Sequence, residues 1–341
     1  MSHQVTIQPS GHIYQVANHE TMLSAAIDAG FNMPYGCRNG ACGACKGKVL
    51  SGEVNYGDYQ STALSDAEKA AGLALFCCAT PLTDAVIECR EASALNEIKP
   101  RIMPARVEKM EKLAPDVMAL FLKLPSNERM QFLAGQYIEF LLKDGKRRAF
   151  SLANAPHNDA FLELHLRLVS GGAFTEHVFN EMQEKAILRL EGPFGSFYLR
   201  DDSNKPIIFV AGGTGFAPIK GLIEHILHQN MQREMVLYWG VKTLVDLYMP
   251  ALPSAWASMH PNFKFIPVLS EPLSSDDWQG RTGFVHQAVL DDFADLSGHE
   301  VYCCGAPGMV DTAKEAFKTR GLPLDAFYAD AFTFAAPAPK A

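Results

Sequence analysis

Three cysteines share one short loop of this chain, and that loop restricts the fold more than any other stretch. Cys37, Cys42 and Cys45 are spaced C-x4-C-x2-C, and the adjacent Cys77 and Cys78 follow further along the chain. This spacing with a distant fourth cysteine is typical of the ligands of a 2Fe–2S cluster. Glycines and alanines between the cysteines let backbone N–H groups approach the sulfurs and stabilise negative charge. Zinc is the alternative, but zinc ligands usually come as C-x2–4-C pairs, whereas three ligands share one loop here.

The composition excludes several other classes. Hydrophobic residues make up 48% and charged residues 20% of 341 residues, which excludes a largely disordered chain and predicts two or three domains. The 30 Lys+Arg against 38 Asp+Glu give a net charge of −8, which argues against nucleic acid as the main partner. No apolar run approaches the roughly 18 residues of a membrane span, and the start lacks an export signal. We therefore expect a cytoplasmic protein with no membrane span. Eight cysteines are too sparse for a disulfide scaffold and favour metal or redox chemistry.

The hydrophobic pattern divides the chain into three domains. The first, residues 1–93, contains the cysteines; its predicted elements are strands 4–9, 12–16 and 47–50 and a helix at 21–29 that ends at Gly30. Weak periodicity and two prolines over residues 91–104 predict a linker, which is placed at 94–103. Short β-runs predict an antiparallel barrel over 104–204, at 117–124, 136–142, 161–169 and 187–190.

From residue 205 to 334 the pattern changes to strand, glycine loop and helix. Apolar strands alternate with helical stretches, which predicts a parallel α/β sheet; the strands are 206–210, 235–240, 263–269 and 301–304, and the helices 218–228 and 308–319. The Ala/Pro-rich tail, 335–341, is expected to be loose.

The cysteine loop, residues 34–49, resembles the cluster loop of plant-type ferredoxins. Their closing motif, Leu-x-Cys-x-Ala-x-Pro, falls on residues 75–81. The resemblance implies a β-grasp α+β fold and a cluster held by Cys37, Cys42, Cys45 and Cys77. The register of the closing motif selects Cys77 rather than Cys78, which is then an ordinary buried cysteine, as is Cys89.

The barrel segment contains Arg148-Ala-Phe150-Ser151, which is a weak signal alone. Together with three glycine motifs it resembles the FAD barrel of the ferredoxin-NADP reductase superfamily; these motifs begin at Gly135, Gly171 and Gly192. A strand places Arg148 and Phe150 on one face, which gives a cation for the pyrophosphate and a ring beside the isoalloxazine. Ser151 can then hydrogen-bond near flavin N5.

The turn at Gly171 and Gly172 leads into a helix, and we expect its free N–H groups to meet a phosphate of FAD, with Thr175 as a further contact. The family usually has tyrosine where this chain has Phe150, so any hydroxyl contact to FAD there is lost.

The third segment opens with a glycine loop, Gly212-Gly213-Thr214-Gly215, and Pro218 lies in the first turn of the next helix. The loop is neither a Walker A loop nor a G-x-G-x-x-G fingerprint, because no Lys-Ser/Thr follows and the sixth position is Pro218. A strand–glycine–helix turn can nevertheless bind a phosphate. Residues 209–218 resemble the nicotinamide-binding loop of the same superfamily. Segments 238–248 and 301–309 also resemble segments of that superfamily.

This match implies that Cys304 lies near the nicotinamide ring and that Gly305 and Pro307 help bind the nucleotide, while Cys303 faces the core. Asp246 would accept a ribose diol, which favours NADH over NADPH; alternatively, it caps the following helix. Relatives place an acid and an aromatic residue beside the flavin, here Asp330 and Phe332; the alternative is an edge strand with a packed phenylalanine.

The resemblance covers about residues 4–332 and is to NADH-dependent flavin/iron–sulfur reductases: reductase components of bacterial oxygenases and CDP-6-deoxy-3,4-glucoseen reductases. It implies an oxidoreductase that passes hydride from NADH to FAD and then single electrons through a 2Fe–2S cluster to a partner protein. That partner is an oxygenase component or a deoxysugar dehydrase, docking near the cluster. The candidate catalytic residues position and tune the cofactors: Ser151, Cys304, Asp330 and Phe332. The alternatives are a free-flavin or quinone reductase and a non-enzymatic redox carrier or sensor.

Overall fold

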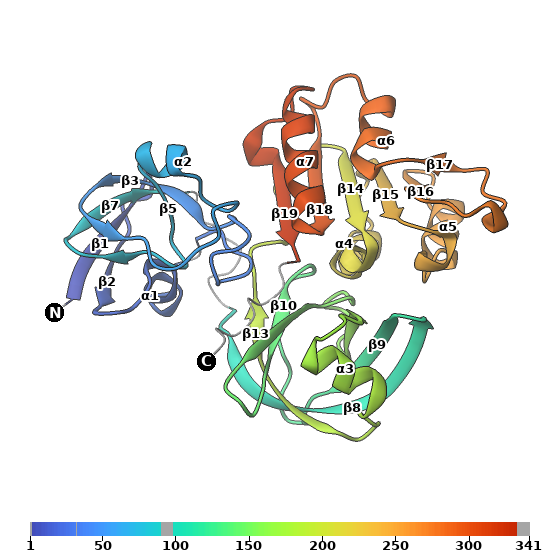
Figure 1. Cartoon of the computed structure of the whole chain (residues 1–341), viewed down its shortest axis with the longest axis horizontal. Coiled ribbons are helices and arrows are strands. Elements are labelled where there is room, and N and C mark those ends of the chain that lie inside the picture. The colour runs from blue at the N-terminus through green and yellow to red at the C-terminus, as the bar shows by residue number, and fades with distance from the viewer. Residues whose placement is uncertain (1, 32, 90–97, 333–341) are drawn as a thin grey trace. The chain divides into compact units, whose positions relative to one another are not determined.

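The computed structural model describes residues 2–31, 33–89 and 98–332 (Figure 1). The chain forms two compact units. The first is Met1–Lys99 with Phe194–Ser196, and the second is Pro100–Pro193 with Phe197–Ala341. The barrel and the parallel sheet therefore belong to one unit and the cysteine-rich domain to the other.

The first unit is built on a five-stranded mixed sheet in the order β2-β1-β7-β3-β5, beside a two-stranded sheet of β4 and β6. Helix α1 begins where the Thr21 side chain accepts a hydrogen bond from Ser24 N–H, and it buries Met22 and Leu23. The α+β fold expected of this domain is confirmed. Its elements are β1 Ser2–Gln8, β2 Ile13–Ala17, α1 Met22–Asp28, β3 Lys46–Ser51, β4 Val54–Asn55, α2 Asp66–Ala70, β5 Leu73–Leu75, β6 Thr80–Pro81 and β7 Ala85–Glu88.

The second unit begins with an antiparallel sheet in the order β11-β10-β13-β8-β9-β12. A bridge between Leu152 and Leu164 joins the two edges of this sheet, which closes it into the expected barrel. Its elements are β8 Arg101–Ala114, β9 Val117–Lys123, β10 Tyr137–Leu141, β11 Arg147–Ser151, β12 Leu162–Arg167, α3 Ala173–Asn180 and β13 Ile187–Phe194.

Strand β8 corrects the predicted linker. We expected irregular chain through residue 103, but β8 begins at Arg101 and carries Pro104 inside it, opposite Arg189 of β13. Only every second side chain of β8 is buried, and the exposed ones are largely charged, among them Arg106 and Glu108. The segment therefore lacks the continuous apolar run by which the other strands were predicted. Residues 94–97 of the predicted linker and the predicted tail at 335–341 lie outside the described residues.

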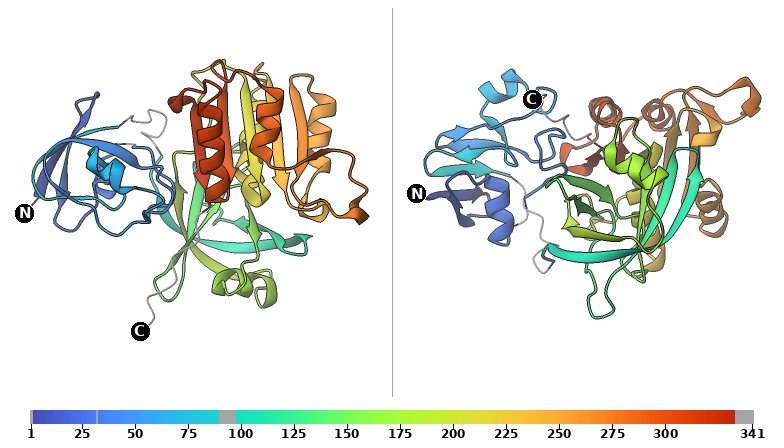
Figure 2. Two further views of the ribbon diagram at one scale, coloured as in Figure 1. Left: turned by 45° about the horizontal axis from the view of Figure 1, so that its top comes forward. Right: turned by 60° about the horizontal axis from the view of Figure 1, so that its bottom comes forward.

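The rest of the second unit is a six-stranded parallel sheet in the order β17-β16-β15-β14-β18-β19. Helices cover both faces; in the left view of Figure 2 the red and orange helices, α7 and α6, lie in front of it. The helices are α4 Phe216–His228, α5 Ala251–Met259, α6 Val285–Asp292 and α7 Pro307–Lys318. The strands are β14 Ile207–Gly212, β15 Met235–Val241, β16 Phe263–Leu269, β17 Arg281–Thr282, β18 Glu300–Gly305 and β19 Phe327–Ala331. Short 3-10 turns are η2 Gly213–Gly215, η3 Leu244–Asp246, η4 Ser274–Asp276 and η5 Leu324–Ala326.

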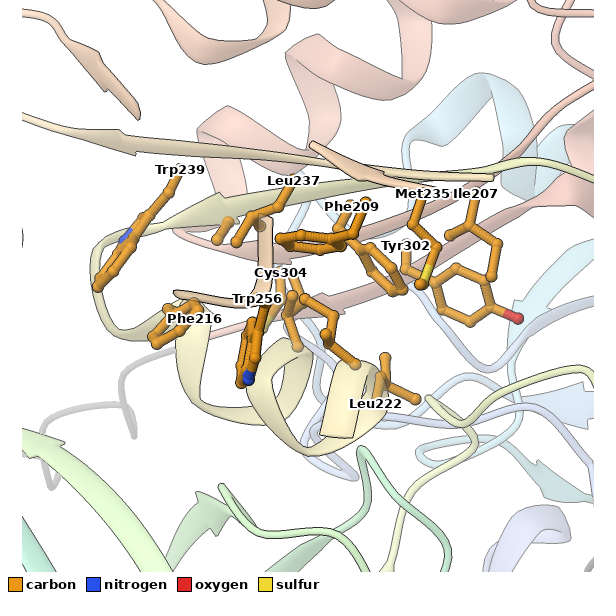
Figure 3. Packing of buried hydrophobic residues seen from close by; sticks show 14 of the residues in the cluster. Ile207, Phe209, Phe216, Leu222, Met235, Leu237, Trp239, Trp256, Tyr302 and Cys304 are labelled. Carbon is orange, nitrogen blue, oxygen red and sulfur yellow. The ribbon is translucent and has the colours of Figure 1, made fainter. Parts of the chain in front are cut away.

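Each face of this sheet has its own core. One contains Phe209, Trp239 and Cys304 and packs on α4 and α5 (Figure 3). The other contains Cys303 and packs on α6 and α7. The predicted placement of Cys303 and Cys304 on opposite faces is confirmed. Among the described helices, none is both long and apolar enough to cross a membrane.

Candidate functional site

The four predicted cluster ligands lie in the first unit as two pairs of sulfurs. A hydrogen bond from Cys42 lowers the pKa of Cys37 to about 6, and one from Cys45 lowers the pKa of Cys77 to about 4. Cys45 and Cys77 are buried, while Cys37 and Cys42 are partly exposed. Across residues 2–31, 33–89 and 98–332, no three His, Cys, Asp or Glu side chains converge as a single metal ion requires. Two pairs of cysteine sulfurs fit the donor set of the two-iron cluster that the cysteine spacing predicts.

The loop backbone points its N–H groups at the sulfurs. The amides of Ala41 and Cys42 lie 3.4 and 3.3 Å from Cys37 Sγ, and the Cys37 amide lies 3.3 Å from Cys42 Sγ. Such N–H···S contacts stabilise the charge of a thiolate cluster and set its potential. Gly40 is needed here, because it has φ +74° and a Cβ would stand 2.8 Å from Cys78 Sγ. These contacts fit the group that the cysteine spacing predicts.

Cys78 lies beside this set, because its Sγ is 3.6 Å from Cys77 Sγ. It is only partly buried, which differs from the buried position that we expected. Cys89 is also partly buried, which again differs from the expectation. Both cysteines belong to a small domain, and a small domain keeps a large share of its residues near the surface.

The barrel places Arg148 and Phe150 on one face of β11, as expected, since they alternate along the strand. Phe150 packs with Phe140 and Phe174, with ring centroids 5.8 and 5.6 Å away. In the part of the chain that the structure describes, Arg148 has no carboxylate partner, whereas its neighbour Arg147 pairs with Glu139 and Glu191. An unpaired guanidinium beside an aromatic cluster fits a flavin nucleotide with a pyrophosphate.

The turn before α3 corrects one expectation. We expected free N–H groups at Gly171 and Gly172, but the Gly171 amide donates to Glu176 Oε1 at 2.7 Å and the Gly172 amide to Val169 O at 2.9 Å. The Thr175 hydroxyl is engaged as well, with Val169 and with Gly172 O at 3.1 Å. The turn uses these groups to hold its own shape.

Three predicted residues meet where the barrel contacts the parallel sheet. Ser151, at the end of β11, donates from Oγ to Asp330 Oδ2 at 3.3 Å. Asp330 on β19 lies opposite Cys304 on β18. Burial raises the pKa of Cys304 well above its usual value, and the nearby Asp330 raises it further, so the thiol keeps its proton. The structure therefore brings Ser151, Asp330 and Cys304 to one place from three strands.

The glycine loop packs directly on this group. Gly215 admits no side chain, because a Cβ would stand 2.1 Å from Cys304 O. Gly212 and Gly305 are also in backbone contact, since a Cβ on Gly305 would lie 3.0 Å from Gly212 Cα. Phe332 N–H donates to Gly305 O at 2.8 Å. The glycine loop, the end of β18 and the amide of Phe332 are thus in direct backbone contact.

Two prolines lie in the first turns of their helices, Pro218 in α4 and Pro307 in α7. Thr214, between the loop glycines, is buried. Asp246 caps the turn that contains it rather than the following helix, α5, which begins after Pro250 without a side-chain cap. Its Oδ2 accepts hydrogen bonds from the Thr243 amide and hydroxyl, both at 2.9 Å, and so begins the η3 turn.

One further candidate binding residue, Arg167, was not predicted from the sequence. Arg167, at the end of β12, lies over the glycine loop, because a Cβ on Gly213 would be 3.5 Å from its Cζ. Its Nε is 3.4 Å from Asp116, yet Nε and Nη2 are buried with no hydrogen-bond partner among the described residues. A dinucleotide pyrophosphate on the glycine loop would satisfy these donors, which shows that the site fits such a ligand.

Comparisons with known families agree with this geometry. The model of the 2Fe-2S iron-sulfur cluster binding domain matches residues 5–82. The oxidoreductase FAD-binding domain matches residues 104–198, and the oxidoreductase NAD-binding domain matches residues 209–315. The three groups that the sequence predicts, 2Fe–2S, FAD and a nicotinamide nucleotide, each have a matching domain.

Whole-chain relatives share this organisation. The CDP-6-deoxy-L-threo-D-glycero-4-hexulose-3-dehydrase reductase of Yersinia pestis is 40% identical over 97% of this chain and 99% of its own length. Terephthalate 1,2-dioxygenase reductase component 2 of Comamonas sp. is 35% identical over 97% of this chain and 98% of its own. The crystal structure of the Amycolatopsis cytochrome P450 reductase GcoB matches with a TM-score of 0.80 and 34% identity, covering 97% of this chain and 98% of that one. The chain therefore belongs to the family of oxidoreductases that join a ferredoxin-type 2Fe–2S domain to an FAD-binding barrel and an NAD-binding domain.

Proposed function

We propose that this protein is an NADH-dependent reductase that delivers single electrons to a partner protein. The observation that carries the proposal is the meeting of Ser151, Asp330 and Cys304 beside the glycine loop. FAD, held by Arg148 and Phe150, would supply the chemistry that joins a two-electron hydride donor to a one-electron cluster. The protein residues supply binding, orientation and electrostatics.

Each residue of the junction has a separate task. Ser151 is oriented by the hydrogen bond that its hydroxyl donates to Asp330, and its oxygen would lie near the edge of the flavin. Cys304 stays a neutral thiol, so it brings no negative charge to the place where the nicotinamide ring would lie. Phe332 is held beside this junction, because its amide is fixed to Gly305. These four residues are positioning groups, and the hydride transfer needs no general acid from the protein.

The cofactor contacts follow from the same geometry. Arg148 would pair with the FAD pyrophosphate, Phe150 would pack beside the isoalloxazine, and the amides of the α3 N-terminus would take the remaining phosphate charge. Gly171, Gly172 and Thr175 shape that turn. The nucleotide would be held by Arg167 and by the loop residues Gly212, Gly213, Thr214, Gly215, Pro218, Gly305 and Pro307.

Charges at the ends of β15 and β16 support NADH as the donor. Lys242 Nζ lies 3.4 Å from Glu271, so the cation at this edge is already shared. Arg281 pairs with Asp291 and Asp292. Asp246 adds a further carboxylate, fixed by Thr243. A 2′-phosphate would meet these acids, and like charges in a binding site can cost several kcal/mol.

Rapid mixing of the holoenzyme with each nucleotide tests this proposal. We expect NADH to reduce the flavin, followed by appearance of the reduced-cluster EPR signal, and kcat/KM for NADH to exceed that for NADPH by about tenfold or more. A tenfold preference for NADPH would refute the assignment of the donor. A protein that binds FAD but accepts no hydride from either nucleotide would be an electron carrier instead.

The acceptor is proposed as a class, a protein that takes single electrons near the cluster. A deoxysugar dehydrase corresponds to the Yersinia relative, and an oxygenase component corresponds to the Comamonas relative. NADH oxidation measured with each purified component separates the two. Equal turnover with free flavin or a quinone, and no gain from either protein, would favour the free-flavin or quinone reductase.

A further inference from the structure

A buried hydrogen-bond chain crosses from the barrel to the parallel sheet and ends at Tyr248. Strand β12 turns its leucines into the barrel core and presents Glu163 and His165 on its opposite face, where they are 9% and 5% exposed. Lys220 of α4 meets Glu163 Oε2 at 2.9 Å. Glu163 Oε1 meets His165 Nε2 at 2.9 Å, and His165 Nδ1 meets the Tyr248 hydroxyl at 3.0 Å. The Tyr248 hydroxyl therefore has its acceptor on the other domain.

The charges along the chain determine the direction of each hydrogen bond. Burial would raise the pKa of Glu163, but the bond to His165 and the charge of Lys220 outweigh it and lower the pKa to about 2. Burial also lowers the pKa of His165, which is therefore neutral, and raises that of Tyr248, which keeps its proton. A carboxylate only accepts, so His165 Nε2 carries the proton and Nδ1 accepts from Tyr248.

The Tyr248 ring connects this chain to the nucleotide loop. Its centroid is 5.0 Å from Trp239 and 6.1 Å from Phe216, and it meets both rings edge-on. Trp239 stacks on Phe216 at 4.0 Å, and Figure 3 shows these two rings side by side above α4. The Trp239 indole N–H donates to Gly213 O at 2.9 Å, and Phe216 directly follows the loop. The three rings therefore hold the loop at both of its ends.

We propose that His165 is a positioning residue for the nicotinamide nucleotide: by accepting the Tyr248 hydrogen bond, it holds the Tyr248–Trp239–Phe216 rings and thus the glycine loop in the geometry that binds the nucleotide. The inference rests on the proposed use of this loop by NADH and deepens it. It makes the nucleotide affinity of one domain depend on a side chain of the FAD-binding barrel. Glu163 and Lys220 keep His165 in the required tautomer.

Three substitutions separate the two hydrogen bonds of His165. Tyr248→Phe removes the donor and keeps the ring. His165→Gln places an amide nitrogen near Nε2, so the bond to Glu163 is kept and the acceptor for Tyr248 is lost. His165→Asn places an oxygen near Nδ1 and retains that acceptor. Tyr238→Phe is the matched control, because its hydroxyl donates to Asp292 at 2.6 Å on the other face of the same sheet.

The measurement is stopped-flow reduction of the bound flavin over a range of NADH concentrations, which gives a dissociation constant and a limiting rate. Tyr248→Phe and His165→Gln should each weaken NADH binding about fivefold, the value of about one hydrogen bond, with a limiting rate within about twofold of wild type. His165→Asn and Tyr238→Phe should bind NADH like wild type. The double variant His165→Gln/Tyr248→Phe should be no weaker than the weaker single variant, because both remove the same bond.

A merely structural role predicts a different result. Lower melting temperatures with unchanged NADH affinity in Tyr248→Phe and His165→Gln would overturn the inference, as would equal losses for His165→Asn and His165→Gln. Flavin content, measured by absorbance, should stay at the wild-type ratio in all variants. If NADPH but not NADH reduced the wild-type flavin, the proposed donor would be refuted. The same variant series titrated with NADPH would then still decide the role of His165.

Discussion

Lys220→Met should destabilise the second unit strongly, because Lys220 is a buried cation, 5% exposed, in an otherwise apolar stretch of α4. Its Nζ contacts Glu163 and Glu224, both at 2.9 Å, and donates to Ala153 O at 3.1 Å. Methionine fills nearly the same volume and offers no charge or donor. The substitution therefore leaves the buried carboxylate of Glu163 and the partly buried carboxylate of Glu224 without their cation.

Two arguments give the same size for the loss of unfolding free energy in Lys220→Met. The pKa of Glu163 falls from 4.5 to about 2, and that difference corresponds to about 3 kcal/mol from all of its partners together. Removing one partner of a buried ion pair costs about 3–5 kcal/mol. Because Glu163 keeps its bond to His165, we expect the lower end, about 3 kcal/mol, which corresponds to a fall of about 1 M in the urea midpoint.

Tryptophan fluorescence during urea unfolding of the holoenzyme is the appropriate assay. All three tryptophans, Trp239, Trp256 and Trp278, lie in the parallel-sheet domain, so the signal reports this unit. Lys314→Met is the control, since Lys314 is exposed on α7, and it should leave the midpoint unchanged. A Lys220→Met midpoint within about 0.3 M of wild type would refute the reasoning.

The pH dependence gives a second test of the same ion pair. Glu163 has a depressed pKa in the folded protein, so its stabilisation is present above the unfolded value of 4.5 and is lost as pH falls toward 2. The difference in urea midpoint between wild type and Lys220→Met should therefore shrink as pH falls from about 5 toward 3. A difference that is constant over this range would show that Lys220 acts through packing alone.

Three further results are expected. Cys77→Ser should abolish the EPR signal of the reduced 2Fe–2S cluster, and Cys78→Ser should leave it; since their sulfurs are 3.6 Å apart, the opposite pattern would show that the register is wrong by one. A fragment that begins at Pro100 should retain FAD and reduce ferricyanide with NADH, yet reduce cytochrome c poorly; loss of FAD would contradict the independence of the second unit. Gly215→Ala should lower kcat/KM for NADH about a hundredfold with FAD content unchanged, because the new Cβ would collide with Cys304 O at 2.1 Å.

Much of the fold and part of the site could be predicted from local patterns. The cysteine spacing predicted the 2Fe–2S domain that the family comparison matches, while the choice of Cys77 over Cys78 came from the resemblance to ferredoxins and stays a prediction. The apolar runs predicted the parallel strands, and the alternation of Cys303 and Cys304 predicted their opposite faces. Strand β8 was missed because Pro104 and the charged residues of the strand resemble a linker until β13 and β9 pair with it. The amides of Gly171 and Gly172 were misjudged because local acceptors, the Glu176 carboxylate and the Val169 carbonyl, compete for them.

The charged face of β12 was missed for a different reason. The sequence Leu-Glu-Leu-His-Leu-Arg alternates in the way that is typical of a strand with one solvent-exposed face. Nothing in the local sequence indicates that another element covers that face. The cover comes from residues 213–248, far along the chain. Two charged residues nevertheless indicated that this face is covered: Lys220 interrupts an apolar helix, and Glu163 interrupts an apolar strand. A charge in a buried element needs a partner of opposite sign. Pairing Lys220 with Glu163 would have predicted both the contact between the barrel and the parallel-sheet domain and the position of His165 within that contact.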